Sequence, residues 1–431
     1  MRSLPRGFLM AVLAFCLVSF GLAAPLLAAG APPILWSRQF GTGIGEEATA
    51  VAVDGSHNAF VGGNTWGNLF GPNAGLCDGF LRKYDYQGAV LWTTQFGTPK
   101  DDEVYDVTTE GSGGAYVVGY TGPLSRPAAH DTDAYVRRYD AGGGLLWAQT
   151  FGTQADDSAW GVAVDRLGNA YVAGWTAGSL FAANAGNEDV FLCKYDANNN
   201  LVWGRQVGSA SGDGSARHCV ALDPSGNIYM GGVTTGDLGG PNPNLYRRLF
   251  LIKYTPEGDL AWQKQYAQWS NSSGGSLAAN AAGKIGMTGE WNGALGNRLD
   301  TGGNVEWTTS LDFLGPGIST YGYGLALDAG GGACIAGDAF GNNRDVLICG
   351  LDASGKYLWH LLQSTMYGEE AYDVAVDSWE RIYVVGWTDG SLFGVNPSLG
   401  YPQAFVEVLP EPATLSLLAL GVLALLGRRR A

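Results

Sequence analysis

Short runs of alternating hydrophobic and polar residues follow one another along most of this chain, and their order repeats. One unit reads LLWAQTF, WGVAVD, NAYVAGWT and DVFLCKYD, with polar turns at residues 165–169 and 196–200. Alternation rich in Val, Tyr, Phe and Trp predicts strands, and tight polar turns between such runs predict hairpins. The central region has no sustained 3.6-residue period, so each unit is predicted to consist of four strands.

A tryptophan near the start of one strand marks every unit. Seven such residues follow one another at intervals of roughly fifty residues: Trp36, Trp92, Trp147, Trp203, Trp262, Trp307 and Trp359. Seven units predict an all-β fold, a seven-bladed β-propeller with four antiparallel strands per blade, because one sheet cannot cover its own two apolar faces. The small residues of VAVD suit the innermost strand, so the tryptophan strand is predicted to be outermost, with its indole against the next blade. An open solenoid is the alternative.

The two ends of the repeat region are incomplete in a complementary way. The first tryptophan strand, Ile34–Gly41, has no inner strands before it, and the last unit stops after its third strand, at Val408. The N-terminal strand is therefore predicted to complete the C-terminal blade, which would hide two sheet edges. The predicted propeller domain spans residues 32–408.

Both termini have the features of processing signals. Residues 1–31 begin with Arg2 and Arg6, continue as an apolar run and end in small residues, which predicts a signal peptide; a lipoprotein signal at Cys16 is the alternative. Residues 409–431 contain a proline–glutamate–proline motif, an apolar run that predicts a short transmembrane helix, and an arginine cluster. The residues of the predicted sorting signal are Pro410, Glu411, Pro412, Arg428, Arg429 and Arg430. The apolar run is shorter than the roughly 20 residues that a full span requires, and a plain tail anchor is the alternative.

The C-terminal segment resembles the PEP-CTERM sorting signal of Gram-negative bacteria. That resemblance implies export, recognition by an exosortase-type membrane enzyme and a setting of exopolysaccharide and biofilm production. The phrases GNAYVAGWT, DVFLCKYD and LLWAQTFGT resemble the bacterial secreted seven-bladed β-propeller repeat, SBBP, over nearly all of Ile34–Val408. The second resemblance implies the fold and an extracellular setting, and it implies no defined activity.

The net charge and the number of cysteines limit which partners and which covalent links the protein is expected to have. The chain carries a net charge of −15, and the acidic excess grows once the basic termini are set aside, so phosphate repulsion argues against a nucleic-acid partner. Five cysteines remain after Cys16, an odd number without a disulfide framework. Cys334 and Cys349 fall on neighbouring predicted strands and are one candidate pair; small apolar filler is the alternative role.

Acidic residues precede the predicted inner strand in units 7, 1, 2 and 3, which are consecutive in a closed ring. They are Glu46, Glu47, Asp101, Asp102, Glu103, Asp156, Asp157, Glu369 and Glu370. Their positions predict an arc of carboxylates at one mouth of the central channel. Such an arc would bind a basic or polyhydroxyl ligand, or a cation such as Ca²⁺, which prefers carboxylate oxygens. Solvated loop charge is the alternative.

No catalytic motif is present, and the four histidines occupy unrelated places in the repeat. We therefore expect a non-catalytic binding or scaffold module, exported to the cell surface or matrix, for exopolysaccharide or protein partners. A polysaccharide lyase or hydrolase with its site at the channel mouth is the alternative, and His, Tyr or Arg converging with the carboxylates would favour it. The sequence predicts only carboxylates there. A structural protein without a soluble ligand is a third possibility.

Overall fold

The computed structural model describes residues 32–410 except 124–130, 271–273, 291–293, 312–313, 315–317, 342, 395 and 397–398. The predicted signal peptide and the sorting signal beyond Pro410 lie outside the described residues. No helix in the described part of the chain is long and apolar enough to cross a membrane. The described elements are strands joined by turns and loops.

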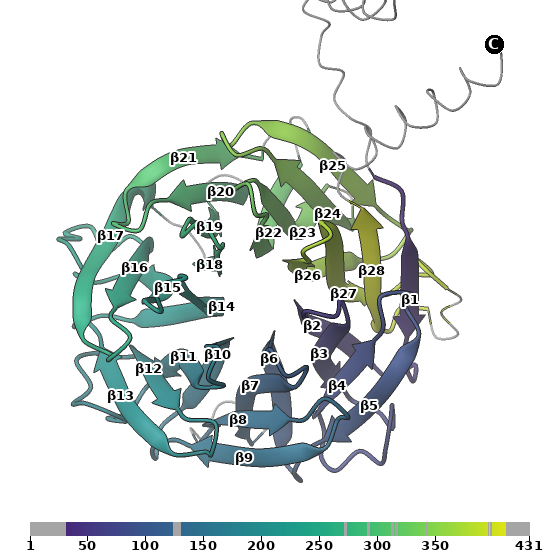
Figure 1. Cartoon of the computed structure of the whole chain (residues 1–431), viewed down its shortest axis with the longest axis horizontal. Coiled ribbons are helices and arrows are strands. Elements are labelled where there is room, and N and C mark those ends of the chain that lie inside the picture. Colours follow the sequence, from purple (N-terminus) through teal and green to yellow (C-terminus); the bar gives the residue numbers. More distant parts are fainter. Residues whose placement is uncertain are drawn as a thin grey trace, which may run out of the picture. The chain divides into compact units, whose positions relative to one another are not determined.

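The strands form seven antiparallel sheets of four strands each, arranged in a ring around one axis (Figure 1). We call these sheets blades 1 to 7 in chain order. Blade 1 contains β2 (Glu46–Val53), β3 (Ala59–Thr65), β4 (Asp78–Tyr84) and β5 (Val90–Phe96); blade 2 contains β6 (Asp101–Thr109), β7 (Ala115–Gly122), β8 (Asp133–Tyr139) and β9 (Leu145–Phe151); blade 3 contains β10 (Asp157–Val164), β11 (Ala170–Thr176), β12 (Asp189–Tyr195) and β13 (Leu201–Val207). The predicted seven-bladed propeller is confirmed.

The remaining blades repeat this order, innermost strand first. Blade 4 contains β14 (Asp213–Leu222), β15 (Ile228–Thr234), β16 (Arg248–Tyr254) and β17 (Leu260–Ser270); blade 5 contains β18 (Gly274–Ala279), β19 (Ile285–Glu290), β20 (Ala294–Leu299) and β21 (Val305–Ser310); blade 6 contains β22 (Ser319–Leu327), β23 (Ala333–Phe340), β24 (Arg344–Leu351) and β25 (Tyr357–Gln363); blade 7 contains β26 (Glu369–Val376), β27 (Arg381–Thr388), β28 (Gln403–Pro410) and β1 (Trp36–Phe40). Because every blade has the same order, all inner strands begin at one rim of the ring, the upper rim, and their hairpin turns lie at the other, the lower rim.

Blade 7 is completed by the first strand of the chain, as predicted. The strand β1 pairs with β28 from Trp36 opposite Val408 to Phe40 opposite Ala404. The pairing covers the edge that β28 would otherwise expose to solvent. The strand β28 continues to Pro410, two residues beyond the predicted boundary, and Pro410 stands opposite Arg381 on β27.

The outer tryptophans join each blade to the next. The Trp36 indole of blade 7 donates a hydrogen bond to the Tyr86 carbonyl in the outer hairpin turn of blade 1, at 3.2 Å. Gly88 of that turn has a φ of +81°, and a Cβ built on it would lie 2.7 Å from Trp36 Cδ2. The same contact between a tryptophan and a glycine of positive φ recurs at Trp92 and Gly143, Trp203 and Gly258, Trp262 and Gly303, and Trp307 and Gly355. The predicted packing of the indole on the next blade is confirmed at these junctions.

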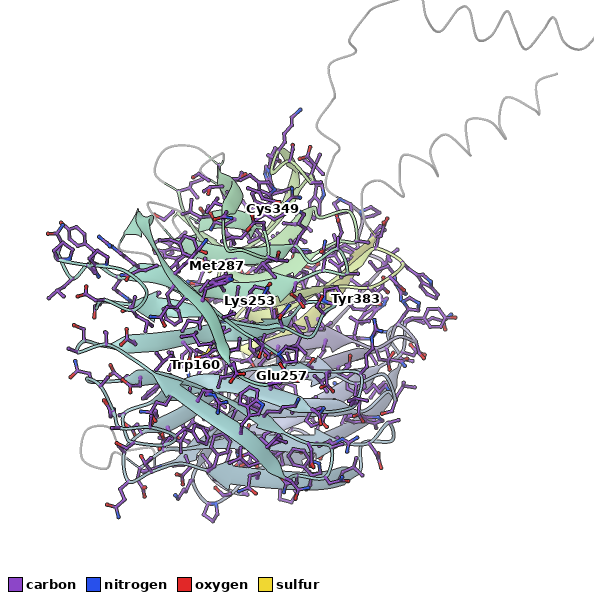
Figure 2. All side chains as sticks on the ribbon, turned by 60° about the vertical axis from the view of Figure 1, so that its left-hand side comes forward. Trp160, Lys253, Glu257, Met287, Cys349 and Tyr383 are labelled. Carbon is purple, nitrogen blue, oxygen red and sulfur yellow. The ribbon has the colours of Figure 1, made fainter. Side chains whose placement is uncertain are left out.

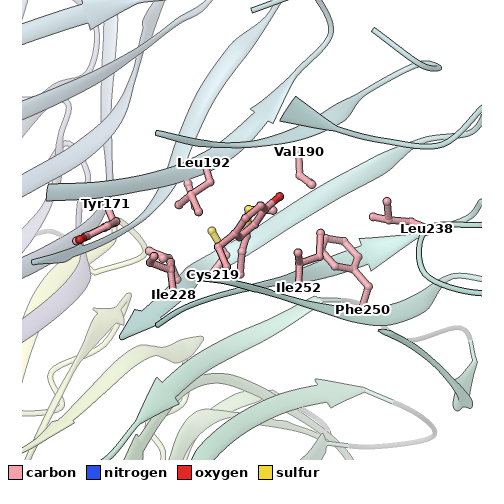
Figure 3. Close-up of a cluster of buried hydrophobic side chains, with 12 residues drawn as sticks. Tyr171, Val190, Leu192, Cys219, Ile228, Leu238, Phe250 and Ile252 are labelled. Atoms are coloured by element: carbon pink, nitrogen blue, oxygen red, sulfur yellow. The ribbon is translucent and has the colours of Figure 1, made fainter. Parts of the chain in front are cut away.

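Apolar side chains fill the space between neighbouring blades. Between blades 3 and 4, Tyr171 and Leu192 pack against Ile228, Phe250 and Ile252, all at most 2% exposed (Figure 3). Near the axis the strands approach too closely for large residues. A Cβ on Gly161 of β10 would lie 2.7 Å from a backbone nitrogen of β14, so the small residues of the inner strands are a steric requirement.

None of the five cysteines in the described propeller forms a disulfide, and all five are buried. Cys349 stands opposite Ile335, and Cys334 stands opposite Gly350. Neighbouring residues of a strand point to opposite faces of a sheet, so the thiols of Cys334 and Cys349 face different blade interfaces. The candidate disulfide between them is therefore wrong, and the cysteines act as small apolar filler.

The glycine under each indole gives a test of how the blades are joined. We expect Gly88→Ala to destabilise the protein by about 2 kcal/mol, because alanine must adopt a positive φ and displace the Trp36 indole. Urea denaturation would measure the change. Gly55→Ala is the matched control, since a Cβ there meets nothing within 4 Å. Equal stabilities of the two variants would contradict this account of the junction.

Candidate binding site at the upper rim

Four of the nine predicted acidic residues are buried structural groups. Each is the first or second residue of an inner strand and accepts a hydrogen bond from the backbone N–H four residues earlier. The pairs are Glu46 with Thr42 (2.7 Å), Asp102 with Thr98 (2.6 Å), Asp157 with Thr153 (2.5 Å) and Glu369 with Thr365 (3.0 Å). The threonine hydroxyls bond to the same carboxylates. These carboxylates hold the segment that connects one blade to the next.

Two further residues of the set lie beside these groups. Asp101 is buried, and burial raises its pKa to about 6, with Glu103 and Asp102 adding to the effect. Asp156 accepts hydrogen bonds from the backbone N–H and the hydroxyl of Thr132, at 3.2 and 3.1 Å. Asp156 therefore ties the loop after β7 to the start of β10.

The remaining three residues, Glu47, Glu103 and Glu370, converge near the axis from blades 1, 2 and 7. Burial raises the pKa of Glu47 to about 7; Arg217 opposes the rise, and Glu103, Glu370 and Asp389 add to it. The Glu47 carboxyl is therefore partly protonated at neutral pH. Of the nine predicted residues, the structure brings only these three together.

Aromatic side chains surround the three carboxylates. In most blades the inner strand has a one-residue bulge, where the ladder skips a residue. The skipped residue is aromatic in four blades. The second strands β7, β11 and β27 add aromatic residues opposite Glu103, Ser158 and Glu370. The seven aromatic residues are Tyr105, Trp160, Tyr323 and Tyr372 at the bulges, and Tyr120, Trp175 and Trp387 on the second strands. The rings of Tyr105 and Trp160 lie 4.5 Å apart, and those of Tyr323 and Tyr372 lie 6.2 Å apart.

Blade 4 breaks this pattern with a larger bulge. The ladder between β14 and β15 skips from Ser215 to Val220. The extra residues bring Arg217 toward the axis, where its guanidinium lies 5.0 Å from the Tyr105 ring and 4.7 Å from the Tyr372 ring. An arginine and several tyrosines thus join the carboxylates, so the prediction that the mouth contains only carboxylates is wrong.

The spacing of the repeat contained the signal for this bulge. The acidic residue that begins the inner strand and the aspartate that follows it are eight positions apart in unit 3, at Asp157 and Asp165, but ten apart in unit 4, at Asp213 and Asp223. When the two ends of a strand are fixed by its neighbours, two extra residues between them cannot pair with the adjacent strand and must form a bulge. Aligning the units on both ends would have identified the Arg217–His218 segment.

The same bulge also brings a histidine to the ring axis, below the carboxylates. His218 of blade 4 lies with Nδ1 2.7 Å from Asp106 Oδ1 of blade 2 and Nε2 3.5 Å from Asp373 Oδ1 of blade 7. Asp106 also accepts a hydrogen bond from the Val162 N–H of blade 3, and Asp373 accepts one from the Val51 N–H of blade 1, at 2.7 and 2.8 Å. One histidine and two aspartates therefore connect five of the seven blades.

The ionisation of this buried group follows from its charges. Burial by itself lowers the pKa of His218, but the carboxylates of Asp373 and Asp106 outweigh it and raise the pKa to about 9. Burial raises the pKa of Asp373 to about 6, and His218 opposes this rise. His218 is therefore protonated at neutral pH.

A surface pocket adjoins the aromatic cluster between blades 3 and 4. Its volume is about 320 Å³, and Trp160, Trp175, Glu188 and Arg247 line it together with the backbone and hydroxyl groups of β14 and β15. Trp160, marked in Figure 2, belongs both to this pocket and to the cluster around the axis. We call the two together the upper-rim site.

Within the described ranges of residues 32–410, no three His, Cys, Asp or Glu side chains are arranged to hold a metal ion. The carboxylates of the upper-rim site instead have aromatic and arginine neighbours. Glu370 illustrates this, because it accepts hydrogen bonds from Arg344 at 2.7 Å and from the Trp387 indole at 3.2 Å. The arrangement suits a polar organic ligand better than a bare cation.

Comparison with known proteins supports the two resemblances. Residues 35–71, 91–122 and 146–182 match the profile of the beta-propeller repeat, SBBP, and residues 408–430 match the PEP-CTERM protein-sorting motif. The chain therefore carries SBBP propeller repeats followed by a PEP-CTERM sorting signal, which implies an exported protein and an exosortase-type processing partner.

Similarity to individual proteins is low. The regulatory protein FlaEY of Caulobacter vibrioides is 28% identical over 186 residues, which are 40% of this chain and 19% of that protein. Among solved structures, the periplasmic gluconolactonase of Pseudomonas aeruginosa is 16% identical with a TM-score of 0.48, covering 74% of this chain and 86% of its own. A protein of unknown function from Bacteroides caccae is 12% identical (TM-score 0.42, 69% and 94% covered), and a puromycin hydrolase mutant is 13% identical (TM-score 0.48, 84% and 54% covered).

The axial histidine generates a pH-dependent prediction. The pKa of His218 in the folded protein, about 9, exceeds its ordinary value of 6.5, so its stabilisation is complete below pH 6.5 and disappears as the pH rises through 9. We expect His218→Gln to cost about 3 kcal/mol at pH 6 and progressively less toward pH 10, because it leaves two buried carboxylates without their cation. Thermal unfolding of both proteins across this range, with His360→Gln on the outer strand as control, would check it. A pH-independent loss would contradict the charge assignment.

Proposed function

We propose that this protein is an exported, non-catalytic binding module of the cell surface or extracellular matrix, and that its ligand is a polyhydroxylated chain such as exopolysaccharide. The observation that supports the proposal is the upper-rim site, where indoles and phenols surround three carboxylates and an arginine. Few places on a protein combine flat apolar faces with this many hydrogen-bonding groups.

The chemistry of sugars matches these side chains. A sugar ring has an apolar C–H face that packs on aromatic rings and an edge of hydroxyls that donate to carboxylates. Trp160 and Trp175 supply the first kind of surface, and Glu188 and Glu103 supply the second. Because Trp160 joins the pocket to the axial cluster, the site suits several consecutive sugar units. The four carboxylates of the site (Glu47, Glu103, Glu188 and Glu370) outnumber its three arginines (Arg217, Arg247 and Arg344), which favours a neutral or amino-bearing glycan over a polyanion.

Binding of oligosaccharides by the full-length chain tests the proposal. We expect Trp175→Ala to weaken binding of any array-selected neutral oligosaccharide roughly tenfold in titration calorimetry, which corresponds to about 1.4 kcal/mol of lost stacking. Trp379→Ala, an exposed tryptophan of the lower rim, is the matched control and should bind normally. Titrations with and without Ca²⁺ would reveal a metal requirement. If the protein bound no glycan and bound a surface protein instead, the proposal of a glycan ligand would be wrong.

A hydrolase or lyase acting on the same ligand is the second candidate, and a specific observation favours it. Glu47 has a pKa near 7 and lies beside Glu103 and Arg217, so a proton donor, a proton acceptor and a fixed positive charge occur together. If the site is catalytic, Glu47→Gln should abolish turnover of the bound oligosaccharide and leave its Kd nearly unchanged. Product analysis by chromatography would detect cleavage. If the oligosaccharide stayed intact after prolonged incubation with the wild-type protein, the catalytic candidate would be excluded and only the binding function would stand.

A further inference from the structure

Exposed apolar residues recur at the lower rim, one or two positions before the outer tryptophan. Six consecutive blades, from blade 7 through blade 5, contribute at least one. These residues are between 36% and 53% exposed: Ile34, Leu35, Val90, Leu91, Leu145, Leu146, Leu201, Val202, Leu260 and Val305. Isolated exposed apolar residues are common on proteins, but repetition at one structural position calls for a physical reason.

The positions of these residues describe a flat surface. The blades are arranged in a ring around one axis (Figure 1). Equivalent residues of successive blades are therefore related by rotation about that axis and are expected to lie close to one plane perpendicular to it. A compact protein partner would contact only a few of them, whereas a planar partner would contact all of them together.

Two inner hairpin turns add apolar tips on the same rim. Leu167, in the turn between β10 and β11, is 80% exposed, and Trp379, in the turn between β26 and β27, is 54% exposed. Trp379 stacks on the His57 ring at 3.5 Å and lies under the Arg381 guanidinium at 4.5 Å. The backbone hydrogen bonds of both turns are made within the turn, so they do not depend on the side chain at either tip.

Basic residues stand beside the half-buried tryptophans of this rim. The cations of Arg205, Lys264 and Arg298 lie 5.3, 5.5 and 5.7 Å from the rings of the outer tryptophans. Tryptophan, leucine and long basic side chains together are the composition of protein surfaces that lie in a lipid headgroup region. The lower rim also carries acidic residues, among them Asp85, Asp140 and Asp196 in its outer turns and Glu306, which pairs with Arg298 at 2.7 Å. Exposed apolar side chains, and not net charge, therefore distinguish this rim.

The chain also leaves the propeller at the lower rim. Pro410, the last described residue, ends β28 opposite Arg381, beside the Trp379 turn. In the sequence, the apolar run and the arginine cluster of the sorting signal follow directly. No spacer would separate the propeller from a membrane that holds this segment.

We propose that the lower rim rests on a lipid bilayer, with Leu167, Trp379 and the apolar residues before the outer tryptophans in the headgroup region. The upper-rim site then points away from the membrane. The occupant is the lipid surface itself; the flat distribution of the apolar residues and the exit of the chain distinguish it from a second copy of the protein.

Single-site fluorescence on the full-length chain tests this orientation, with Cys16→Ser so that the introduced cysteine is labelled while the five buried thiols of the propeller are not. An environment-sensitive nitrobenzoxadiazole label on Leu167→Cys should brighten several-fold and shift to the blue with phosphatidylcholine vesicles, and lipid-borne quenchers should reduce the signal. The matched control is the same label on Leu76→Cys, which is 54% exposed in an upper-rim loop and should respond to neither. Flotation of the labelled protein with the vesicles establishes that it is bound.

Three results would overturn the proposal. They are failure of the protein to float with the vesicles, equal responses of the two labels, and a response at position 167 that depends on protein concentration without lipid. The last result would assign the rim to contacts between copies of this chain. Adding Trp379→Ser to the labelled Leu167→Cys protein should make the fluorescence response to lipid smaller than that of labelled Leu167→Cys alone. A stability measurement on the double variant separates loss of membrane contact from loss of fold.

Discussion

The pairing of β1 with β28 is the contact on which the rest of the structure depends. Each blade has two apolar faces and is stable only between two neighbours, so a ring with one open junction would expose two faces and two sheet edges. The ladder from Trp36 and Val408 to Phe40 and Ala404 removes that junction with main-chain hydrogen bonds. The indole of Trp36 then reaches Gly88 in blade 1, so the strand that completes blade 7 also fastens it to its neighbour.

The bulges explain how a uniform frame produces one special region. A bulged residue takes no part in the ladder, so its side chain can change without loss of pairing. In this chain those positions hold Tyr105, Trp160, Tyr323 and Tyr372, and the larger bulge of blade 4 adds Arg217 and His218. The frame keeps the inner strands small and apolar, while the variable positions concentrate near the axis. His218 closes the ring from within, and Arg217 contributes to the surface above it.

The sequence predicted the fold almost completely, because the fold depends on patterns that repeat seven times. The strands, their order, the outer position of the tryptophans and the splice at Val408 were all recoverable from one unit and its copies. The candidate site was predicted only in part. Glu46 and Glu47 are adjacent in sequence, yet one bonds to Thr42 and the other faces the axis, since successive residues of a strand point to opposite faces. The contribution of Arg217 depends on side chains that meet across the ring, and no local pattern records such a meeting.

The closing contact also constrains how the protein can be made. The strand β1 precedes β28 by more than three hundred residues, and every blade lies between them. An exported chain that emerges from its N-terminus therefore delivers β1 first, long before its partner, and blade 7 can form only when the last part of the repeat region has been released. Contacts of such long range are slow to form and leave an unpaired edge in the meantime. Secretion of this protein thus requires that the emerging chain be kept from aggregating until its ends can meet.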